Sequence, residues 1–197
     1  MNANTSLACL FDHYGSDKTT NGYAGLYECM FKYLRYQPVT LMEIGIGTMI
    51  PGVWSSMKGY MPDSYQPGAS LRAWRDYFPK GDIIGMDLQP DTQFSEPRIR
   101  TILTDSRDGG KVTEMLDQLG VSAIDIIIDD GSHSVGDQMA TLAANMPRVV
   151  TGGTYVIEDS AAGPGLIDIA KEVVGNMPMF LLGPSCNMLV ISNCRYP

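Results

Sequence analysis

The hydrophobic positions of the chain follow two patterns that alternate along its length. Short apolar runs are typical of buried strands, and they occur at 39–45, 82–87, 99–105, 124–130, 153–159, 179–183 and 187–192. Segments with apolar residues three and four positions apart are typical of amphipathic helices, and they occur at 23–36, 70–78, 108–120, 133–146 and 166–175. The sequence therefore predicts strands and helices in alternation.

This alternation predicts an α/β fold with a doubly wound, Rossmann-like sheet. Continuous apolar runs such as DIIIDD indicate strands that are covered on both faces, as in a mostly parallel sheet between two helical layers. The last two strands differ, because only a short turn containing Gly183 and Pro184 joins them. A parallel crossover needs about a dozen residues or more, so these strands are expected to form an antiparallel hairpin at one edge.

Length, composition and charge limit the number of domains and the kinds of ligand. A chain of 197 residues, 44% of them hydrophobic, predicts a single domain over 1–197, with 1–38 as an N-terminal lid and helix and 49–67 as an insertion. The 22 acidic residues outnumber the 14 basic ones, which gives a net charge of −8. Because phosphate binding needs a basic face, this balance argues against nucleic acid as a partner. A small molecule or a cation as the ligand fits this acidic charge balance better.

The chain shows no sign of export or of membrane insertion. Its first residues lack the basic region and the long apolar stretch of a signal peptide, and the uncharged stretch 173–194 is broken too often by glycine, proline and asparagine to span a bilayer. The four cysteines have no CxxC spacing, which argues against a structural zinc site and a disulfide framework. We therefore expect a cytoplasmic protein without a membrane partner.

Polar residues gather where the predicted strands end. They are Glu43, Gly45 and Gly47 after the first strand, Asp87 after the second, Asp105 and Ser106 after the third, Asp129 and Asp130 after the fourth, and Glu158 and Asp159 after the fifth. Ligands of doubly wound sheets bind beyond these carboxyl ends. Since crowded carboxylates repel one another, such a set indicates a ligand or a cation.

The turn after the first strand favours a nucleoside over a dinucleotide. Gly45 and Gly47 are followed by Ile50 where the dinucleotide pattern GxGxxG requires a third glycine. Without the 49–67 insertion, Asp87 has the spacing of an acid that accepts hydrogen bonds from two ribose hydroxyls. The two glycines could also serve backbone geometry alone.

The ends of the fourth and fifth strands predict a metal site and a base. Asp130, Glu158 and Asp159 are expected to meet at one point, and three carboxylates without cysteine favour Mg²⁺, or else Ca²⁺ or Mn²⁺, over zinc. His133 follows Asp130 by three residues, and its ordinary pKa suits a general base. Alternatively, Asp130 or Glu158 caps a helix or binds the cofactor.

Several motifs together resemble a known family. They are YGSDK (14–18), EIGIGT (43–48), GASLRAWRDYFPKG (68–81), EPRI (96–99), IIDDGSH (127–133) and GGTYVIED (152–159). The chain resembles class I S-adenosylmethionine-dependent methyltransferases, and more narrowly the macrolide-sugar O-methyltransferases of the mycinamicin and macrocin type. The resemblance implies a metal-dependent, often oligomeric O-methyltransferase with Asp130, Glu158 and Asp159 on the metal and His133 as base. The chain departs from these enzymes in lacking a large N-terminal domain and in its 49–67 insertion.

We therefore expect an S-adenosylmethionine-dependent, Mg²⁺-assisted O-methyltransferase for a hydroxyl of a sugar or polyketide-like small molecule, working as a homo-oligomer in natural product biosynthesis. The expected cofactor-binding residues are Asp17, Glu43, Gly45, Gly47, Ser70, Asp87, Asp105, Ser106 and Asp129. Met and Tyr residues of the insertion suit an apolar acceptor or a subunit interface equally well. The competing hypotheses are a carboxyl- or N-methyltransferase that needs no metal, and a non-catalytic nucleoside-binding domain. The missing third glycine disfavours a nicotinamide dehydrogenase.

Overall fold

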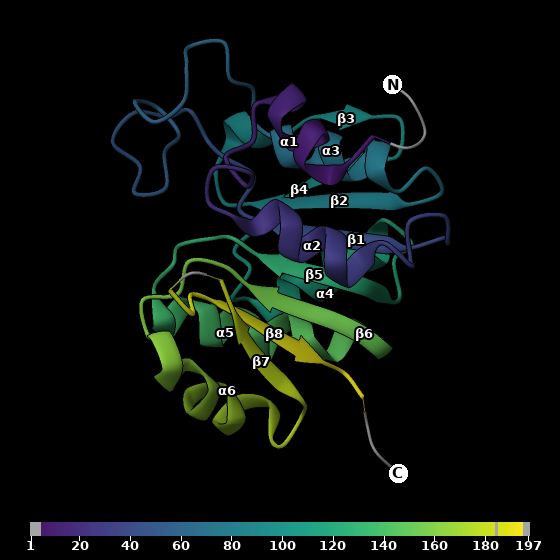
Figure 1. Cartoon of the computed structure of the whole chain (residues 1–197), viewed down its shortest axis with the longest axis vertical. Coiled ribbons are helices and arrows are strands. Elements are labelled where there is room, and N and C mark those ends of the chain that lie inside the picture. Colours follow the sequence, from purple (N-terminus) through teal and green to yellow (C-terminus); the bar gives the residue numbers. More distant parts are fainter. Residues whose placement is uncertain (1–4, 184, 195–197) are drawn as a thin grey trace.

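The computed structural model describes residues 5–183 and 185–194, and an eight-stranded sheet runs through this part of the chain (Figure 1). The strands are β1 (Thr40–Ile44), β2 (Asp82–Asp87), β3 (Ser95–Glu96), β4 (Ile99–Leu103), β5 (Ile124–Asp129), β6 (Val149–Ile157), β7 (Met179–Leu182) and β8 (Met188–Ser192), in the order β3-β4-β2-β1-β5-β6-β8-β7. The five strands from β4 to β6 in this order are parallel. β7 and β8 are antiparallel and end the sheet, so the predicted fold and its edge hairpin are confirmed.

Helices cover both faces of the sheet. They are α1 (Leu7–Tyr14), α2 (Tyr23–Phe31), α3 (Ala69–Tyr77), α4 (Gly109–Gln118), α5 (Val135–Asn145) and α6 (Leu166–Val174), with short 3-10 turns η1 (Pro90–Thr92), η2 (Met146–Arg148) and η3 (Gly163–Gly165). Neighbouring strand residues face opposite layers: Leu41 packs in the core under α1, α2 and α3, whereas Met42 packs in the core under α4, α5 and α6. This two-sided burial is why the strands read as continuous apolar runs.

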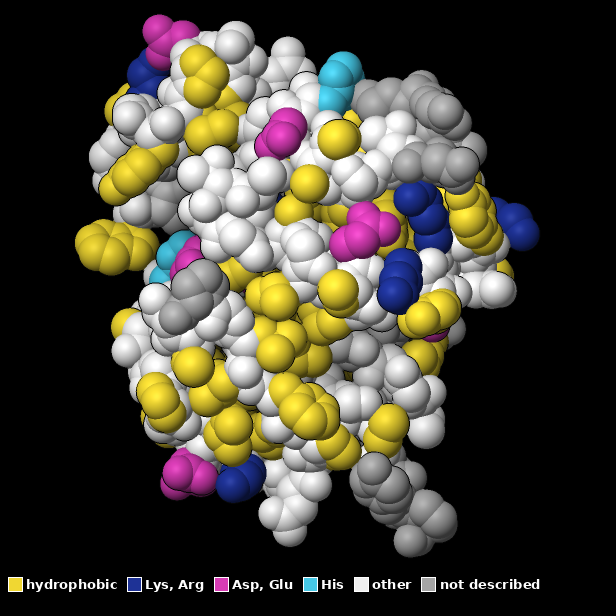
Figure 2. Space-filling view, in the orientation of Figure 1, with side chains coloured by type: hydrophobic (Ala, Val, Ile, Leu, Met, Phe, Trp, Pro, Cys, Tyr) yellow, Lys and Arg dark blue, Asp and Glu magenta, His cyan; other side chains and the backbone are white. Residues whose placement is uncertain are grey.

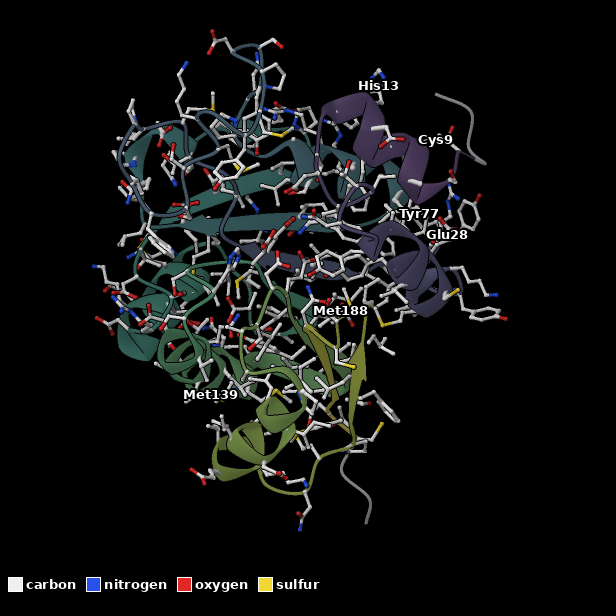
Figure 3. All side chains as sticks on the ribbon, turned by 60° about the vertical axis from the view of Figure 1, so that its left-hand side comes forward. Cys9, His13, Glu28, Tyr77, Met139 and Met188 are labelled. Atoms are coloured by element: carbon white, nitrogen blue, oxygen red, sulfur yellow. The ribbon has the colours of Figure 1, made fainter. Side chains whose placement is uncertain are left out.

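The N-terminal helix α1 was not among the predicted elements. Ser6 caps it by accepting a hydrogen bond from the Cys9 amide at 3.3 Å, and the left-handed Gly15 ends it. Glu28 of α2 accepts hydrogen bonds from the Leu7 amide at 2.8 Å and from the Tyr77 hydroxyl of α3 at 3.0 Å (Figure 3). One half-buried carboxylate thereby joins the three helices of this layer.

Other features of the fold also differ from the prediction. The helix expected over 23–36 ends at Phe31. Residues 32–36 form turns instead, and the side chain of Leu34 is 36% exposed. The edge strand β3 has two residues and no sequence pattern of its own. β7 was expected to be buried, but Phe180 is 58% exposed, and Figure 2 shows hydrophobic side chains gathered over the half of the molecule that holds β7 and β8.

The predicted insertion is a loop that extends from the carboxyl end of β1 (Figure 1, blue). Residues 49–67 contain no helix or strand and one isolated bridge between Lys58 and Met61. The Met57 amide fixes the loop by donating to the Thr48 carbonyl at 2.8 Å. Among the described helices, none is long and apolar enough to cross a bilayer.

Candidate functional site

The carboxyl ends of the central strands meet at one edge of the sheet. Backbone hydrogen bonds continue the ladders past the strand ends, from Gly45 to Met86, from Asp130 to Ile44 and from Glu158 to Asp129. Two adjoining cavities of about 250 and 350 Å³ open at this edge. They share part of their lining, and the shared residues are Gly45, Trp54, Ser55, Asp87 and Gly131. This is where ligands of doubly wound sheets bind.

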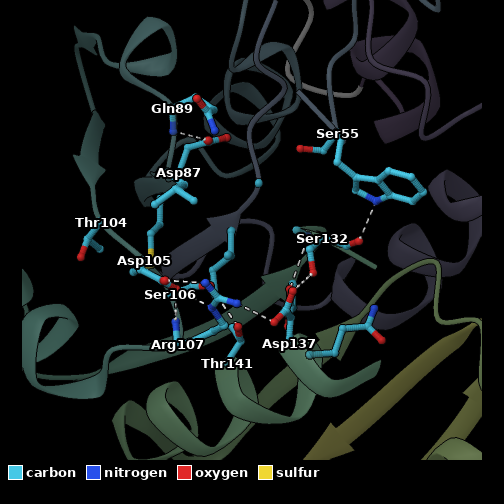
Figure 4. Close-up of a pocket in the computed structure, with 18 of the residues that line it drawn as sticks. Ser55, Asp87, Gln89, Thr104, Asp105, Ser106, Arg107, Ser132, Asp137 and Thr141 are labelled. Carbon is cyan, nitrogen blue, oxygen red and sulfur yellow. Dashed lines mark hydrogen bonds and ion pairs between the residues drawn. The ribbon is translucent and has the colours of Figure 1, made fainter. Parts of the chain in front are cut away.

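The structure distributes the predicted site residues over three places. Asp87, Asp105, Ser106 and Asp129 line the smaller cavity, which we call the first cavity (Figure 4). The larger, second cavity is lined by Asp17, Gly45, Gly47, Ser70, Asp130, His133 and Asp159, and Gly45 and Asp87 belong to both. Glu43 and Glu158 are buried beneath the cavities and line neither.

Asp87 is fixed at the tip of β2. One carboxylate oxygen accepts from the Ile46 amide and the other from the Gln89 amide, both at 2.9 Å (Figure 4). Burial raises the pKa of Asp87, and these amide bonds oppose that shift. Each carboxylate oxygen can accept a second hydrogen bond. The group is therefore oriented and keeps free acceptor capacity toward both cavities.

The opposite wall of the first cavity is a network of charged and polar side chains. The Arg107 guanidinium pairs with Asp105 at 2.7 Å and with Asp137 at 2.6 Å (Figure 4). Ser106 and Thr141 share a hydrogen bond at 3.0 Å. This network links the end of β4 to α5.

Gln138 is a lining residue that the sequence analysis missed. Its side chain is buried and donates to the Glu158 carbonyl at 2.9 Å, while its amide oxygen has no partner among the described residues. A buried acceptor without a partner is costly unless a ligand or water satisfies it. The only sequence signal was a glutamine on the buried face of a predicted helix.

Gly45 and Gly47 both have positive φ, and at Gly45 the backbone of a neighbouring segment also leaves no room for a side chain. Gly45 has φ +81°, and a Cβ there would lie 2.1 Å from the Asp130 carbonyl oxygen. Gly47 has φ +83°, and its Cβ would lie 2.1 Å from the Tyr65 hydroxyl. Backbone geometry alone thus explains why these positions are glycine, and their role toward the cofactor stays a prediction.

Replacing Gly45 by alanine is expected to destabilise the fold by about 1–3 kcal/mol more than the same change at Gly120, because it forces a methyl group against backbone. Gly120 is a matched control: its φ is also positive, at +72°, but its Cβ would meet nothing within 4 Å. Urea unfolding of both variants measures the difference. Equal losses would show that the left-handed backbone, and not the close approach to Asp130, dictates glycine.

Asp130, His133 and Asp159 form a group at the wall of the second cavity. One ligand atom from each lies within 4.8 Å of the others, and His133 Nε2 is 3.1 Å from Asp130 Oδ1. The hydrogen bond to Asp130 raises the pKa of His133. His133 and Asp159 both have positive φ, at 59° and 51°, which is a strained conformation for residues other than glycine. The fold therefore holds both side chains in place at a local cost.

A buried lysine lies behind this group. The Lys18 ammonium is 2.7 Å from Asp130, 2.7 Å from Glu158 and 3.1 Å from Glu43. Burial opposes ionisation of Asp130, but the neighbouring Lys18 lowers the pKa of this carboxyl to about 2. The Tyr27 hydroxyl also donates to Glu158. The structure thus places Glu158 in this buried network, apart from the group of Asp130, His133 and Asp159.

Three other predicted residues, Glu43, Asp129 and Asp159, are held by hydrogen bonds or by burial. Glu43 accepts from the Trp74 indole at 3.0 Å. Asp159 accepts from the Tyr23 hydroxyl and from the Asn187 amide. Asp129 is 2% exposed, and burial raises its pKa to about 7. The sequence analysis missed these partners, because tyrosines and a tryptophan at helical spacing read as core residues.

We next compare the chain with known proteins. No family model matches it. It is 39% identical over 156 residues to the 8-demethyl-8-(2-methoxy-alpha-L-rhamnosyl)-tetracenomycin-C 3'-O-methyltransferase of Streptomyces olivaceus, a match that covers 78% of this chain and 36% of that protein. It is 38% identical over 143 residues to the mycinamicin VI 2''-O-methyltransferase of Micromonospora griseorubida, covering 71% and 32%.

Similarity to solved structures points to the same group of enzymes. The MycE methyltransferase from the mycinamycin biosynthetic pathway, in complex with Mg and S-adenosylhomocysteine, superposes with a TM-score of 0.76 and 28% identity over 97% of this chain and 55% of that chain. The chain spans about a third of the length of the curated relatives that it matches. It is a homologue of the macrolide-sugar O-methyltransferases and has the Rossmann-like fold of S-adenosylmethionine-dependent methyltransferases.

Proposed function

We propose that this chain is an S-adenosylmethionine-dependent, Mg²⁺-assisted O-methyltransferase for a hydroxyl of a sugar or polyketide-like small molecule. The observation that carries the proposal is that Asp87 and the group of Asp130, His133 and Asp159 line the same cavity. A nucleoside-binding acid and a proton acceptor thus open onto one space. An assay with glycosylated polyketides tests it: a methyl ether on a sugar is expected, and a methyl ester as the product would contradict it.

The first cavity fits the nucleoside part of the cofactor. Asp87 keeps free acceptor capacity for ribose hydroxyls, and the unpartnered Gln138 oxygen can accept from an amino group. The proposed holding residues are Asp87, Asp105, Ser106 and Asp129 here, with Asp17, Gly45, Gly47 and Ser70 in the second cavity and Glu43 beneath them. The partial overlap of the two cavities lets one ligand reach from the ribose-binding side to the base.

The donor set at the second cavity fits a hard divalent cation. Asp130 and Asp159 offer carboxylate oxygens beside one imidazole, and cysteine is absent from the group. Glu158 remains a proposed third carboxylate ligand, although its carboxylate contacts Lys18 and Tyr27. When bound, S-adenosylmethionine supplies an activated methyl group and the cation lowers the pKa of an acceptor hydroxyl.

His133 is the proposed general base. Its Nε2 faces Asp130, so the second ring nitrogen, Nδ1, is left to accept a proton from the acceptor hydroxyl. Asp130 then stabilises the imidazolium through the same contact, which is consistent with the raised pKa of His133. The strained backbone at His133 holds the ring against Asp130 and toward the cavity. The remaining contribution of the chain is alignment of the reacting groups.

Trp54 provides a direct assay of cofactor binding. Its indole is 88% exposed, lines both cavities and donates to the Ser132 carbonyl at 3.2 Å. The sequence contains one other tryptophan, Trp74, which is buried. Adding S-adenosylhomocysteine is therefore expected to change the fluorescence of wild-type protein and to leave that of a Trp54→Phe variant unchanged. A variant that keeps the full signal would place the ligand away from Trp54.

We further propose a cytoplasmic homo-oligomer that takes a small-molecule acceptor and binds neither nucleic acid nor membranes. The net charge of −8 supports the absence of a nucleic-acid partner. Exposed side chains of the 49–67 loop support a role in holding the acceptor or a neighbouring subunit, since Tyr60 is 87% exposed and lines the second cavity together with Met57.

A further inference from the structure

Lys18 is a buried cation at the centre of the site. Its side chain is 2% exposed, and its ammonium contacts Glu43, Asp130 and Glu158 within 3.1 Å. A lysine is almost never buried unless it is paired, and here one ammonium faces three carboxylates. Two of them, Asp130 and Glu158, are also proposed metal ligands.

The contacts divide Asp130 between two neighbours. Its Oδ2 accepts from Lys18, and its Oδ1 faces His133. Glu158 is likewise divided, but between two residues outside the group: one oxygen accepts from Lys18 and the other from Tyr27. Lys18 and Tyr27 together hold both oxygens of Glu158, and of these two contacts Lys18 is the one that Glu158 shares with Asp130.

We propose that Lys18 is an internal competitor of the divalent cation. This inference rests on the metal site of the proposed function: ammonium and cation draw on the same carboxylates, so metal binding displaces Nζ from Asp130 and Glu158. Both are hard cations that need oxygen partners, and one set of oxygens cannot satisfy both fully. Lys18 thus acts as a positioning residue that weakens metal affinity and keeps the carboxylates ordered before the metal arrives.

The competition also connects the metal to the wall of the second cavity. Ser16 and Asp17, which precede Lys18, line this cavity. The Lys18 carbonyl accepts from the Tyr23 amide at 2.9 Å and from the Ala24 amide at 3.1 Å, so the residue is fixed to the start of α2. Displacement of the ammonium therefore changes the support of the segment that precedes α2.

Manganese binding to the full chain tests the proposal, measured by calorimetry or electron paramagnetic resonance without cofactor or acceptor. Lys18→Met is expected to bind Mn²⁺ at least about tenfold tighter than wild type, since the removed charge no longer competes. Lys111→Met is the matched control: it removes the same charge from an exposed site on α4 and should leave the affinity unchanged. Asp159→Asn should bind more weakly. Equal or weaker binding by Lys18→Met would overturn the proposal.

A second measurement on wild-type protein covers the case in which Lys18→Met does not fold. Amine acylation followed by mass spectrometry should label Lys18 slowly in EDTA and several-fold faster at saturating Mn²⁺, with Lys111 labelled equally in both. Unchanged Lys18 labelling at proven saturation would overturn the proposal. Neither measurement involves methyl transfer, so a chain that binds manganese competitively but makes no product would refute the proposed function alone.

Discussion

Replacing His133 by alanine is expected to lower kcat by about 10²–10⁴-fold, the usual contribution of a general base. The variant should bind S-adenosylhomocysteine like wild type, because the proposed site of its nucleoside is the first cavity, which His133 does not line. Asp130 loses only the contact to Nε2 and keeps its ion pair with Lys18. Steady-state kinetics at saturating cofactor and acceptor, together with calorimetric titration of S-adenosylhomocysteine, measure the two effects separately.

The chain supplies its own control in His13, its second histidine. His13 lies in the last turn of α1 and lines neither cavity (Figure 3). His13→Ala should therefore leave kcat unchanged. A His133→Ala enzyme with undiminished kcat would remove His133 from the role of base. A loss of cofactor affinity equal to the loss of kcat would instead indicate a structural role.

Removing divalent cations with EDTA is expected to reduce turnover by at least about two orders of magnitude, and Mg²⁺ should restore it. The expectation follows from Asp130 and Asp159, whose carboxylates lie together with His133 at the wall of the second cavity. Cofactor binding in EDTA should persist, because Asp87 and the Arg107 network do not depend on the metal.

Replacing Asp159 by asparagine removes the charge of one proposed metal ligand. The variant is therefore expected to need more Mg²⁺ than wild type for the same activity. Magnesium titration of both proteins measures this shift. Full activity of the wild-type chain without divalent ions would refute the metal-assisted mechanism and favour the metal-independent carboxyl- or N-methyltransferase.

The sheet could be predicted from the sequence because strands that are buried on both faces consist mainly of apolar residues. The central strands are mostly apolar, and an acidic residue lies at or next to the carboxyl end of each, where the chain leaves the core. The helix α1 leaves a weaker record, because it is short and its marks are a Ser6 N-cap, a Gly15 C-cap and three buried apolar residues that pack with α2 and α3. Its stability comes from tertiary contacts such as Glu28, which no local pattern reveals.

The candidate site could be predicted as a set of residues, but its contacts could not. The parallel order of β1, β2, β5 and β6 was enough to bring Asp87 and Asp130 to one edge. Whether a carboxylate faces a cavity or a buried lysine depends on side chains from distant segments. Lys18 and Glu158 lie 140 positions apart in the sequence, so the spacing of residues within motifs could not predict their contact or the burial of Glu158.

The proposed activity can be tested by transfer of an isotopically labelled methyl group from S-adenosylmethionine, with Mg²⁺, to polyketides that carry a rhamnose or related sugar with free hydroxyls. Mass spectrometry and NMR then locate the label. We expect a labelled methyl ether on a sugar oxygen, formed by the wild-type chain and nearly absent with His133→Ala. Tight S-adenosylmethionine binding without transfer to any acceptor, or a label on nitrogen or a carboxyl group, would contradict it.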